Sequence, residues 1–344
     1  MNGPKIRNME EFASVSGISR PTVSKYFNDP DSVRPSTKAR IEAALKTHDF
    51  RPNMFAVNQN RRMTRNIGIV VPYLSDPFFA EMARQLGTMV IDAGFRPILL
   101  SSHGDPGQEI DNLDSLRAIK PAGVLMAPLG LGSDFDQIEA FGEDVPTVHF
   151  DSNIAGLGDL FVGHNSAQST DLMVDYLIRT GEPPVFFEMK TPTNPNADHR
   201  RNAYVRAMER CGFAPEFVKV DGTDWNFEEI GYQGGLKAIE SRRLPSNTIL
   251  CSNDRLAIGL LAAAYEKGLR VGRGAGHALR VAGHDDHPFS RFTCPPLTTI
   301  TQDYPGITRR AFECLFKLIN QDNRRSGVRS EVLLDGQLVL RASA

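Results

Sequence analysis

The chain has 344 residues, of which 41% are hydrophobic and 23% charged, and its formal net charge is −2. This length suits two or three domains, and the absence of a long apolar run excludes a chain built around membrane-spanning helices. The first twenty residues are polar and lack the apolar core of a secretion signal, and the four cysteines form no CxxC pair. We therefore expect a cytoplasmic protein with reduced cysteines and no membrane partner.

The charge is divided unevenly along the chain. Residues 1–65 carry 12 lysines and arginines against 6 acidic residues, a net of +6, which leaves −8 for the remainder. A small basic region joined to an acidic body is typical of a protein in which only the basic region meets nucleic-acid phosphates. A solvated charged surface would give the same pattern, so the charge alone leaves both interpretations open.

Three short helices are predicted at the N-terminus. The first covers residues 8–16, with Asn8 as its N-cap and Gly17 as its end. The second is capped by Ser19 and runs through Pro21–Phe27, where proline is tolerated in the first turn. The third runs from about residue 36 to 48. Two short helices joined by a tight turn, with a third packed across them, are typical of a DNA-binding helix-turn-helix, although similar helices occur in domains that bind no DNA.

From Asn66 onwards, apolar runs alternate with amphipathic stretches. Buried strands are predicted at Ile67–Val71, Pro97–Leu100, Gly123–Ala127, Thr147–Phe150, Val185–Phe187, Thr248–Cys251 and Leu279–Ala282. Helices are predicted between them, including Phe78–Ala93, Ser166–Thr180, Arg200–Cys211 and Arg255–Lys267. This alternation is typical of parallel α/β sheets covered on both faces, and about 280 residues are too many for one such sheet. The sequence therefore predicts two α/β lobes.

The ordered set of motifs resembles the LacI/GalR regulators along nearly the whole chain. The resemblance is carried by residues 9–28, 33–45, 50–53, 75–79, 251–254, 283–286, 295–303 and 338–341. It implies an all-α helix-turn-helix headpiece at 1–52, a hinge helix and linker at 53–65, and a periplasmic-binding-protein-like body of parallel sheets at 66–344. It places lobe 1 at about 66–162 and 294–325, and lobe 2 at about 163–293 and 326–344.

The resemblance also implies which residues contact double-stranded DNA. The second helix would enter the major groove, where Arg20, Pro21 and Lys25 match the positions that choose the sequence. The phosphate-contacting positions are Ser19, Thr22, Ser24, Asn28 and Thr37, although any single hydroxyl here could instead cap a helix. In the hinge, Asn53 and Ala56 fit the pattern. Gln59 stands where the family places a leucine that wedges into the minor groove, so we expect operator bending to be weaker or differently achieved.

A cleft between the lobes should hold a small-molecule effector. Asp76, Phe78 and Phe79 follow the first predicted strand and should face this cleft at its carboxyl end. The resemblance implies that Arg200, Asn253 and Asp285 also line it, and Asp151 and Trp225 are lesser candidates. Polar groups of this kind hold the hydroxyls of a sugar or polyol, and aromatic rings stack on a sugar or on a purine. Asn253 could instead cap the helix that follows it, and the two phenylalanines could belong to the core.

Residues 284–287, with the sequence His-Asp-Asp-His, contain the residue types of a metal site, but adjacent side chains at a strand end cannot all converge on one ion. We therefore expect no metal and no cofactor. No nucleophile–base signature is present, so catalysis is not expected. The sequence favours a homodimeric, ligand-responsive repressor of a carbohydrate-utilisation operon that binds a palindromic operator. The alternatives are a regulator that responds to a purine or other non-sugar metabolite, and a sugar-binding protein without DNA function.

Overall fold

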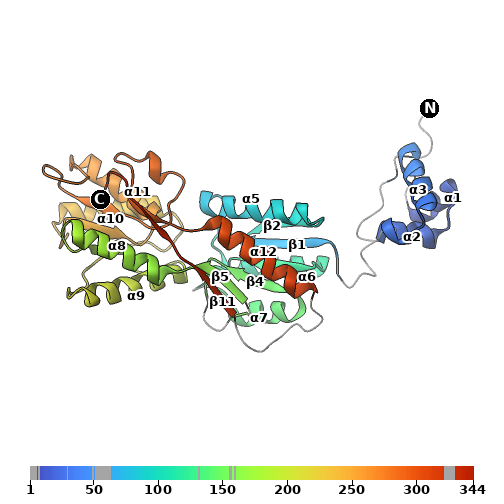
Figure 1. The fold of residues 1–344 in the computed structure, drawn as a ribbon, viewed down its shortest axis with the longest axis horizontal. Coiled ribbons are helices and arrows are strands. Elements are labelled where there is room, and N and C mark those ends of the chain that lie inside the picture. The colour runs from blue at the N-terminus through green and yellow to red at the C-terminus, as the bar shows by residue number, and fades with distance from the viewer. Residues whose placement is uncertain are drawn as a thin grey trace. The chain divides into compact units, whose positions relative to one another are not determined.

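The computed structural model describes residues 6, 8–28, 30–48, 50, 63–130, 132–154, 157–158, 160–320 and 330–344. The chain divides into two compact units, Met1–Thr64 and Arg65–Ala344, which we call the head and the body (Figure 1). Among the described residues, every helix is too short or too polar to cross a lipid bilayer.

The head contains α1 (Met9–Ser16), α2 (Arg20–Asn28), a short 3-10 turn (Pro30–Ser32) and α3 (Pro35–His48). The Asn8 side chain accepts a hydrogen bond from the Glu11 amide at the start of α1, and Gly17 ends the helix with a φ of 63°. The helices enclose a small core that includes Phe12 and Ile41, both fully buried. The three predicted helices are thus confirmed, with bounds that differ by about one residue.

Lobe 1 of the body is built on a six-stranded parallel sheet in the order β11-β5-β4-β3-β1-β2 (Figure 1). Its strands are β1 (Asn66–Val71), β2 (Arg96–Ser101), β3 (Gly123–Met126), β4 (Thr147–Phe150), β5 (Leu160–His164) and β11 (Ser330–Leu334). Helices α5 (Pro77–Asp92) and α12 (Tyr304–Asn320) contribute to one apolar cluster against the sheet, and α6 (Pro106–Ile119) and α7 (Phe135–Asp144) contribute to another. Helices thus cover both faces of the sheet.

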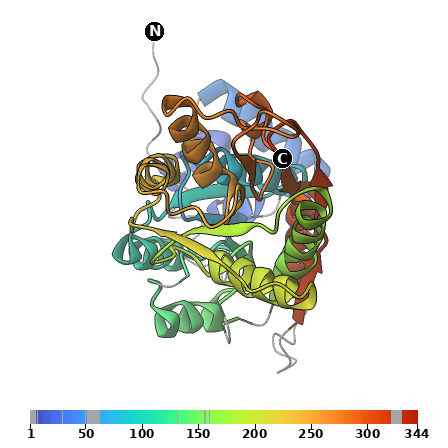
Figure 2. The ribbon, with the colours of Figure 1, turned by 90° about the vertical axis from the view of Figure 1, so that its left-hand side faces the viewer.

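Lobe 2 is built on a four-stranded parallel sheet in the order β7-β6-β8-β9. Its strands are β6 (Val185–Met189), β7 (Phe217–Val220), β8 (Thr248–Cys251) and β9 (Arg280–Ala282). Helix α8 (Ser166–Thr180) packs on α9 (Pro195–Arg210), and α10 (Phe227–Glu240) packs on α11 (Asp254–Glu266). Figure 2 shows these two pairs on different sides of the lobe. A separate antiparallel pair, β10 (Thr299–Thr301) and β12 (Gln337–Val339), lies against α8, and a short 3-10 turn covers Ser290–Phe292.

Two predicted lobe boundaries are wrong in part. We expected residues 326–344 to lie in lobe 2, but residues 330–334 form β11, which pairs in parallel with β5 at the edge of the lobe 1 sheet, whereas Ala344 packs in a lobe 2 cluster as expected. We expected residues 294–325 to lie in lobe 1, but the Thr298 carbonyl oxygen accepts a hydrogen bond from the Gly283 amide of lobe 2. Strand β11 has only exposed and half-buried residues, and its apolar run, Val332–Leu334, is shorter than the run of about four or more residues by which buried strands are predicted. The same weakness explains why β7, whose residues alternate between buried and exposed, was not predicted.

Candidate functional site

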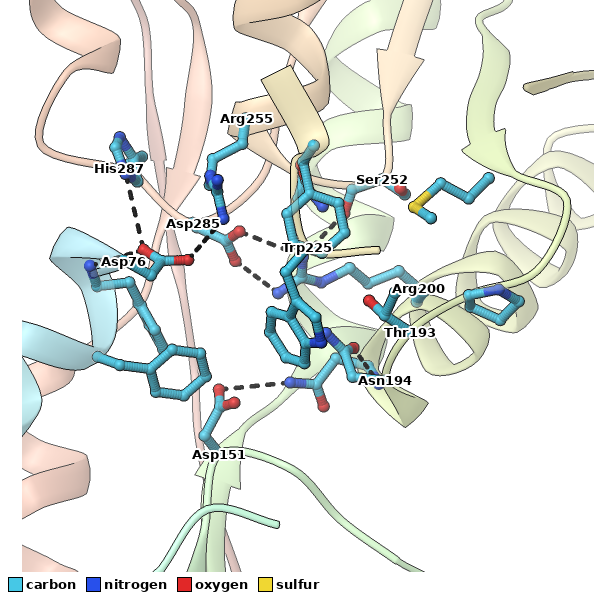
Figure 3. A pocket seen from close by; sticks show the side chains of 18 of the residues that line it. Asp76, Asp151, Thr193, Asn194, Arg200, Trp225, Ser252, Arg255, Asp285 and His287 are labelled. Atoms are coloured by element: carbon cyan, nitrogen blue, oxygen red, sulfur yellow. Dashed lines mark hydrogen bonds and ion pairs between the residues drawn. The ribbon is translucent and has the colours of Figure 1, made fainter. Parts of the chain in front are cut away.

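A cavity of ≈ 60 Å³ lies in the body, between the two sheets (Figure 3). Its lining comes from segments that follow the carboxyl ends of β1, β4, β6, β8 and β9. Parallel α/β sheets place their ligand-binding loops at this edge of the strands. The cavity brings together all eight predicted effector residues: Asp76, Phe78, Phe79 and Asp151 from lobe 1, and Arg200, Trp225, Asn253 and Asp285 from lobe 2.

The lobe 2 side of the cavity is organised around Asp285. Its Oδ1 accepts hydrogen bonds from Arg200 Nη2 at 2.5 Å and from Gln302 Nε2 at 2.6 Å. Burial alone would raise the pKa of Asp285, but the Arg200 guanidinium and His284 outweigh that effect and hold the pKa below its ordinary value. Arg200 is also held by the Ser252 carbonyl oxygen at 2.8 Å. Asp285 is therefore an ionised carboxylate with fixed partners.

A second carboxylate, Asp76, joins the two lobes. It is the N-cap of α5, where its Oδ1 accepts a hydrogen bond from the Phe78 amide at 2.9 Å, and Pro77 follows in the first turn. Its Oδ2 accepts a hydrogen bond at 3.0 Å from Nη1 of Arg255 on α11 of lobe 2. Burial raises the pKa of Asp76, and Arg255 offsets only part of that rise. Arg255 also forms a two-pronged pair with Glu228, at 2.7 and 2.6 Å.

The third carboxylate, Asp151, has a weaker partner. It follows β4 with a φ of 61° and is 7% exposed. Its Oδ1 accepts a hydrogen bond from Nδ2 of Asn196, on α9 of lobe 2, at 3.3 Å. Burial raises the pKa of Asp151 to about 7, and although Arg200 opposes this rise, Asp285 and Asp76 add to it. Asp151 therefore has capacity to accept further hydrogen bonds from a bound molecule.

The aromatic lining also spans the lobes. The Trp225 ring of lobe 2 stacks on Tyr73 of lobe 1, with centroids 6.2 Å apart and an interplanar angle of 2°. It also meets Phe79 edge-on, with centroids 6.2 Å apart and an interplanar angle of 63°, and Phe79 in turn contacts Phe78. Phe79 and Trp225 are both part of the main apolar cluster and part of the cavity wall. Core packing of these aromatic residues is therefore observed, and their contact with a ligand stays a prediction.

Asn253 also serves two purposes. Its side chain accepts a hydrogen bond from the Leu256 amide at 2.8 Å, so it is the N-cap of α11, and the residue lies at the cavity wall. The neighbouring Asp254 is fully buried outside the cavity lining, where it accepts hydrogen bonds from Thr299 Oγ1 and Ser290 Oγ at 2.6 Å each. The capping role is thus observed, and contact of Asn253 with a ligand stays a prediction.

Eleven lining residues lie outside the predicted effector set, and four of them, Asn196, Arg255, His287 and Gln302, have polar side chains that contact or face the three carboxylates. Gln302 lies in the motif 295–303 and Arg255 directly follows the motif 251–254, so both stood beside predicted features. Three buried polar atoms at the cavity, Arg200 Nε, His287 Nε2 and Gln302 Oε1, have no hydrogen-bond partner among the described residues. Each such atom costs about 1–3 kcal/mol unless a ligand or water satisfies it. The cavity is therefore built for a polar occupant.

The segment 284–287 does not gather its side chains at one point. His284 Nε2 lies 3.0 Å from Ser169 Oγ, Asp286 accepts a hydrogen bond from Arg341 Nη2 at 2.6 Å, and Asp285 faces Arg200. The part of the chain that the structure describes contains no group of three or more histidine, cysteine or acidic residues able to hold a metal ion.

The head presents the candidate nucleic-acid interface. The predicted base-reading residues Arg20, Pro21 and Lys25 lie in α2 and are exposed. The guanidinium of Arg20 lies 3.7 Å from the Glu10 carboxylate, and both side chains are largely exposed, so this pair restrains Arg20 only weakly. Ser19 Oγ lies 2.8 Å from Thr22 Oγ1, which ties two predicted phosphate-contacting hydroxyls to each other.

The structure describes the other predicted DNA-contacting residues only in part. Thr37 is half-buried in the first turn of α3, and Ser24 is half-buried in α2. Asn28 ends α2, but its side chain lies outside the described part of the structure, as do the hinge residues Asn53, Ala56 and Gln59. The expectation about operator bending at Gln59 therefore stays a prediction from sequence.

The head and the body each match a family of known proteins. Residues 8–53 match the family model "Bacterial regulatory proteins, lacI family", and residues 174–344 match "Periplasmic binding protein-like domain". The ribose operon repressor of Escherichia coli (strain K12) is 28% identical over 315 residues, which cover 91% of this chain and 93% of that protein. The repressor PurR of Histophilus somni (strain 129Pt) is 26% identical over 343 residues, with 97% and 98% covered.

The fold is also that of a solved regulator. The crystal structure of the Lac repressor dimer bound to operator and the anti-inducer ONPF superimposes with a TM-score of 0.80 at 22% identity, covering 98% of this chain and 99% of that one. The match extends over both the head and the body. The chain therefore combines a helix-turn-helix region that matches the lacI family of bacterial regulatory proteins with a periplasmic-binding-protein-like body.

Proposed function

We propose that this protein is a cytoplasmic, homodimeric LacI-family repressor of a carbohydrate-utilisation operon, and that its effector is a neutral monosaccharide or polyol. Its relatives include a ribose operon repressor. The observation that carries the choice of effector is the charge and hydrogen-bonding state of the cavity, in which three carboxylates face two arginines.

The charge argues for a neutral ligand. Asp76, Asp151 and Asp285 supply three carboxylates, and Arg200 and Arg255 supply two cations that are already hydrogen-bonded to carboxylates. No positive charge is left over among these lining residues for the phosphate of a nucleotide or the carboxylate of a sugar acid. A hydroxyl both donates and accepts, so a polyhydroxyl ligand can satisfy Asp151 together with the unpaired nitrogen of Arg200 and the unpaired oxygen of Gln302.

The size of the cavity also favours a monosaccharide or polyol as the ligand. One water needs about 10–15 Å³ of cavity volume, so ≈ 60 Å³ holds roughly four to six waters. At about 30 Å³ of liquid volume for each water, such a cavity suits a molecule as large as a pentose or a hexose. A purine nucleoside, with a base in addition to its sugar, would require the lobes to move apart.

The head supplies the DNA-reading surface. We assign base contacts in the major groove to the exposed side chains of Arg20, Pro21 and Lys25 on α2, where the arginine is suited to guanine and the proline offers only apolar contact. The hydroxyls of Ser19, Thr22, Ser24 and Thr37 would position the head on phosphates. A homodimer would place two such heads on the half-sites of a palindromic operator.

Effector and operator binding would be coupled through the lobes. Both lobes line the cavity, so a ligand that favours one angle between them shifts the population of the two body states by its differential affinity.

The test is a thermal-shift screen of the full-length protein with D-ribose, D-xylulose, xylitol, D-glucose, D-gluconate, D-ribose 5-phosphate, hypoxanthine and adenosine. A ligand of the native state raises Tm by mass action. We expect neutral sugars or polyols to raise Tm, and the anionic sugars to have little effect. A Tm that rises only with hypoxanthine or adenosine would overturn the choice of effector. Salt-insensitive binding to palindromic DNA would overturn the regulator itself.

A further inference from the structure

His287 has a place in the cavity that its surroundings fix. It lies on the loop after β9, is 3% exposed, and faces Asp76 across the lobes (Figure 3). Its backbone amide donates a hydrogen bond to Asp254 Oδ2 at 2.9 Å. The same oxygen accepts a hydrogen bond from Ser290 Oγ, three residues further along the loop. Because a buried carboxylate binds this loop at two points, the imidazole ring has little freedom to turn away.

The hydrogen bonds also determine which ring nitrogen carries the proton. The Phe289 amide donates to Nδ1 of His287 at 3.3 Å, so Nδ1 is an acceptor and Nε2 bears the hydrogen in the neutral ring. Burial lowers the pKa of His287, and although Asp76 opposes this shift, Arg255 adds to it. The groups that face the ring therefore leave it neutral at pH 7, with one N–H that points at the cavity.

That N–H has no hydrogen-bond partner within the described residues. Its nearest carboxylate oxygen, Asp76 Oδ1, lies 3.8 Å from Nε2, which is too far for a direct hydrogen bond. Two atoms at this separation can both reach one hydroxyl oxygen at about 2.7–2.9 Å. The hydroxyl would accept from His287 Nε2 and donate to Asp76 Oδ1, a combination that an ether, a carbonyl or a C–H group cannot provide.

We propose that His287 is a specificity-determining residue of the effector cavity, which together with Asp76 recognises one particular hydroxyl of the bound polyol. This inference rests on the proposed function, because it takes the effector to be a neutral polyol. His287 and Asp76 come from different lobes, so both can bind the recognised hydroxyl only when the lobes are closed on the ligand. A site built to hydrogen-bond a hydroxyl rejects the analogue that lacks it more strongly than an apolar pocket rejects an altered shape.

The experiment compares full-length wild type with His287→Phe, which removes the N–H and keeps a flat ring, and with His287→Gln, which retains an N–H donor. His277→Phe is the control, because His277 lies on the surface of the same lobe, away from the cavity. Calorimetry measures the affinity for the panel sugar that raises Tm most, and for each of its monodeoxy forms. Circular dichroism confirms that each variant is folded.

The expected result is selective. Every monodeoxy form binds wild type and His277→Phe more weakly than the parent sugar, whereas His287→Phe loses discrimination at one hydroxyl only and binds the parent sugar roughly five- to a hundred-fold more weakly. His287→Gln recovers part of that discrimination. A purely structural role of His287 would weaken the parent and all deoxy forms alike.

The two proposals fail differently. If the wild type binds a panel sugar and His287→Phe keeps full discrimination at every hydroxyl, or weakens binding of all forms equally, the role of His287 is overturned and the proposed function stands. If no panel sugar binds wild type, the proposed function is overturned and the inference falls with it.

Discussion

The two lobes contribute carboxylates to one cavity, but in different states. Asp285 of lobe 2 is held by Arg200 of the same lobe and by Gln302 on the segment between β10 and α12, and its pKa lies below the ordinary value. The carboxylates of lobe 1 depend on partners from lobe 2: Asp76 on Arg255, and Asp151 on Asn196. The comparison shows that lobe 2 carries a preassembled charged site, whereas the lobe 1 half is completed only by contact between the lobes.

We expect the largest effect on stability when the preassembled Arg200–Asp285 pair of lobe 2 is broken. Arg200→Ala would leave Asp285, whose side chain is 20% exposed, without its cation, and removing one partner of such a largely buried ion pair costs about 3 kcal/mol in the free energy of unfolding. Urea unfolding measures the loss. The control is Arg206→Ala, an exposed position on the same helix, where we expect a change within about 0.5 kcal/mol. Similar losses for the two variants would remove the basis of the comparison.

Asp151 offers a test of the lobe 1 half by pH. An unfolded aspartate has a pKa near 3.9, whereas burial raises that of Asp151 to about 7. Between these values the native state keeps a proton that the unfolded chain has released, so the contribution of Asp151 to stability is full below pH 4 and is lost as the pH rises towards 7. Asp151→Asn lacks this loss, so from pH 5 to pH 8 it should gain roughly 2–3 kcal/mol relative to wild type.

The titration of Asp254 does not affect the difference between wild type and Asp151→Asn. Burial also raises the pKa of Asp254 to about 7, but it is present in both proteins, so the difference between their urea-unfolding profiles isolates Asp151. Parallel profiles from pH 5 to pH 8 would mean that Asp151 is ionised in the folded protein throughout this range.

Closure of the lobes can be tested with a pair of glycines. A Cβ on Gly104 of lobe 1 would lie 2.7 Å from Cδ1 of Trp225 in lobe 2, whereas a Cβ on Gly94 would meet no atom within 4 Å. Both residues have a left-handed φ, of 74° and 79°, so alanine carries a similar backbone strain at each. We expect Gly104→Ala to weaken binding of the stabilising sugar about tenfold, or about 1.4 kcal/mol by calorimetry, and Gly94→Ala to leave it unchanged. Equal affinities would show that closure does not need this contact.

The smallest expected effect concerns Asp76. In Asp76→Asn the amide oxygen can still cap α5, and Arg255 keeps its two-pronged pair with Glu228, so no buried charge is left alone. Urea unfolding of the protein without ligand should therefore show a loss of about 1 kcal/mol or less. A loss as large as that of Arg200→Ala would mean that the Asp76–Arg255 contact is as firmly preassembled as the Asp285 site.

Much of the fold follows from local sequence. Asn8 and Gly17 bound the first helix because a side-chain acceptor and a left-handed glycine satisfy its ends, and the strand before Asp76 is an unbroken apolar run. Since parallel strands place their carboxyl ends at one edge, residues that follow different strands can be assigned to one cavity from the sequence. By contrast, β11 is a short edge strand with no buried residue, and its place in lobe 1 comes only from its pairing with β5.

The sequence alone predicts the family resemblance of this chain and eight of the residues that gather at the cavity. Which of those residues are already satisfied depends on the tertiary structure, because the deciding contacts cross the lobes: Arg255 reaches Asp76 over a separation of 179 residues, and Asn196 reaches Asp151 over 45. The same contacts leave His287 Nε2 unpaired beside Asp76 in the described part of the chain. Burial and distance between separate segments set the charge state of each group, and local sequence patterns contain neither quantity.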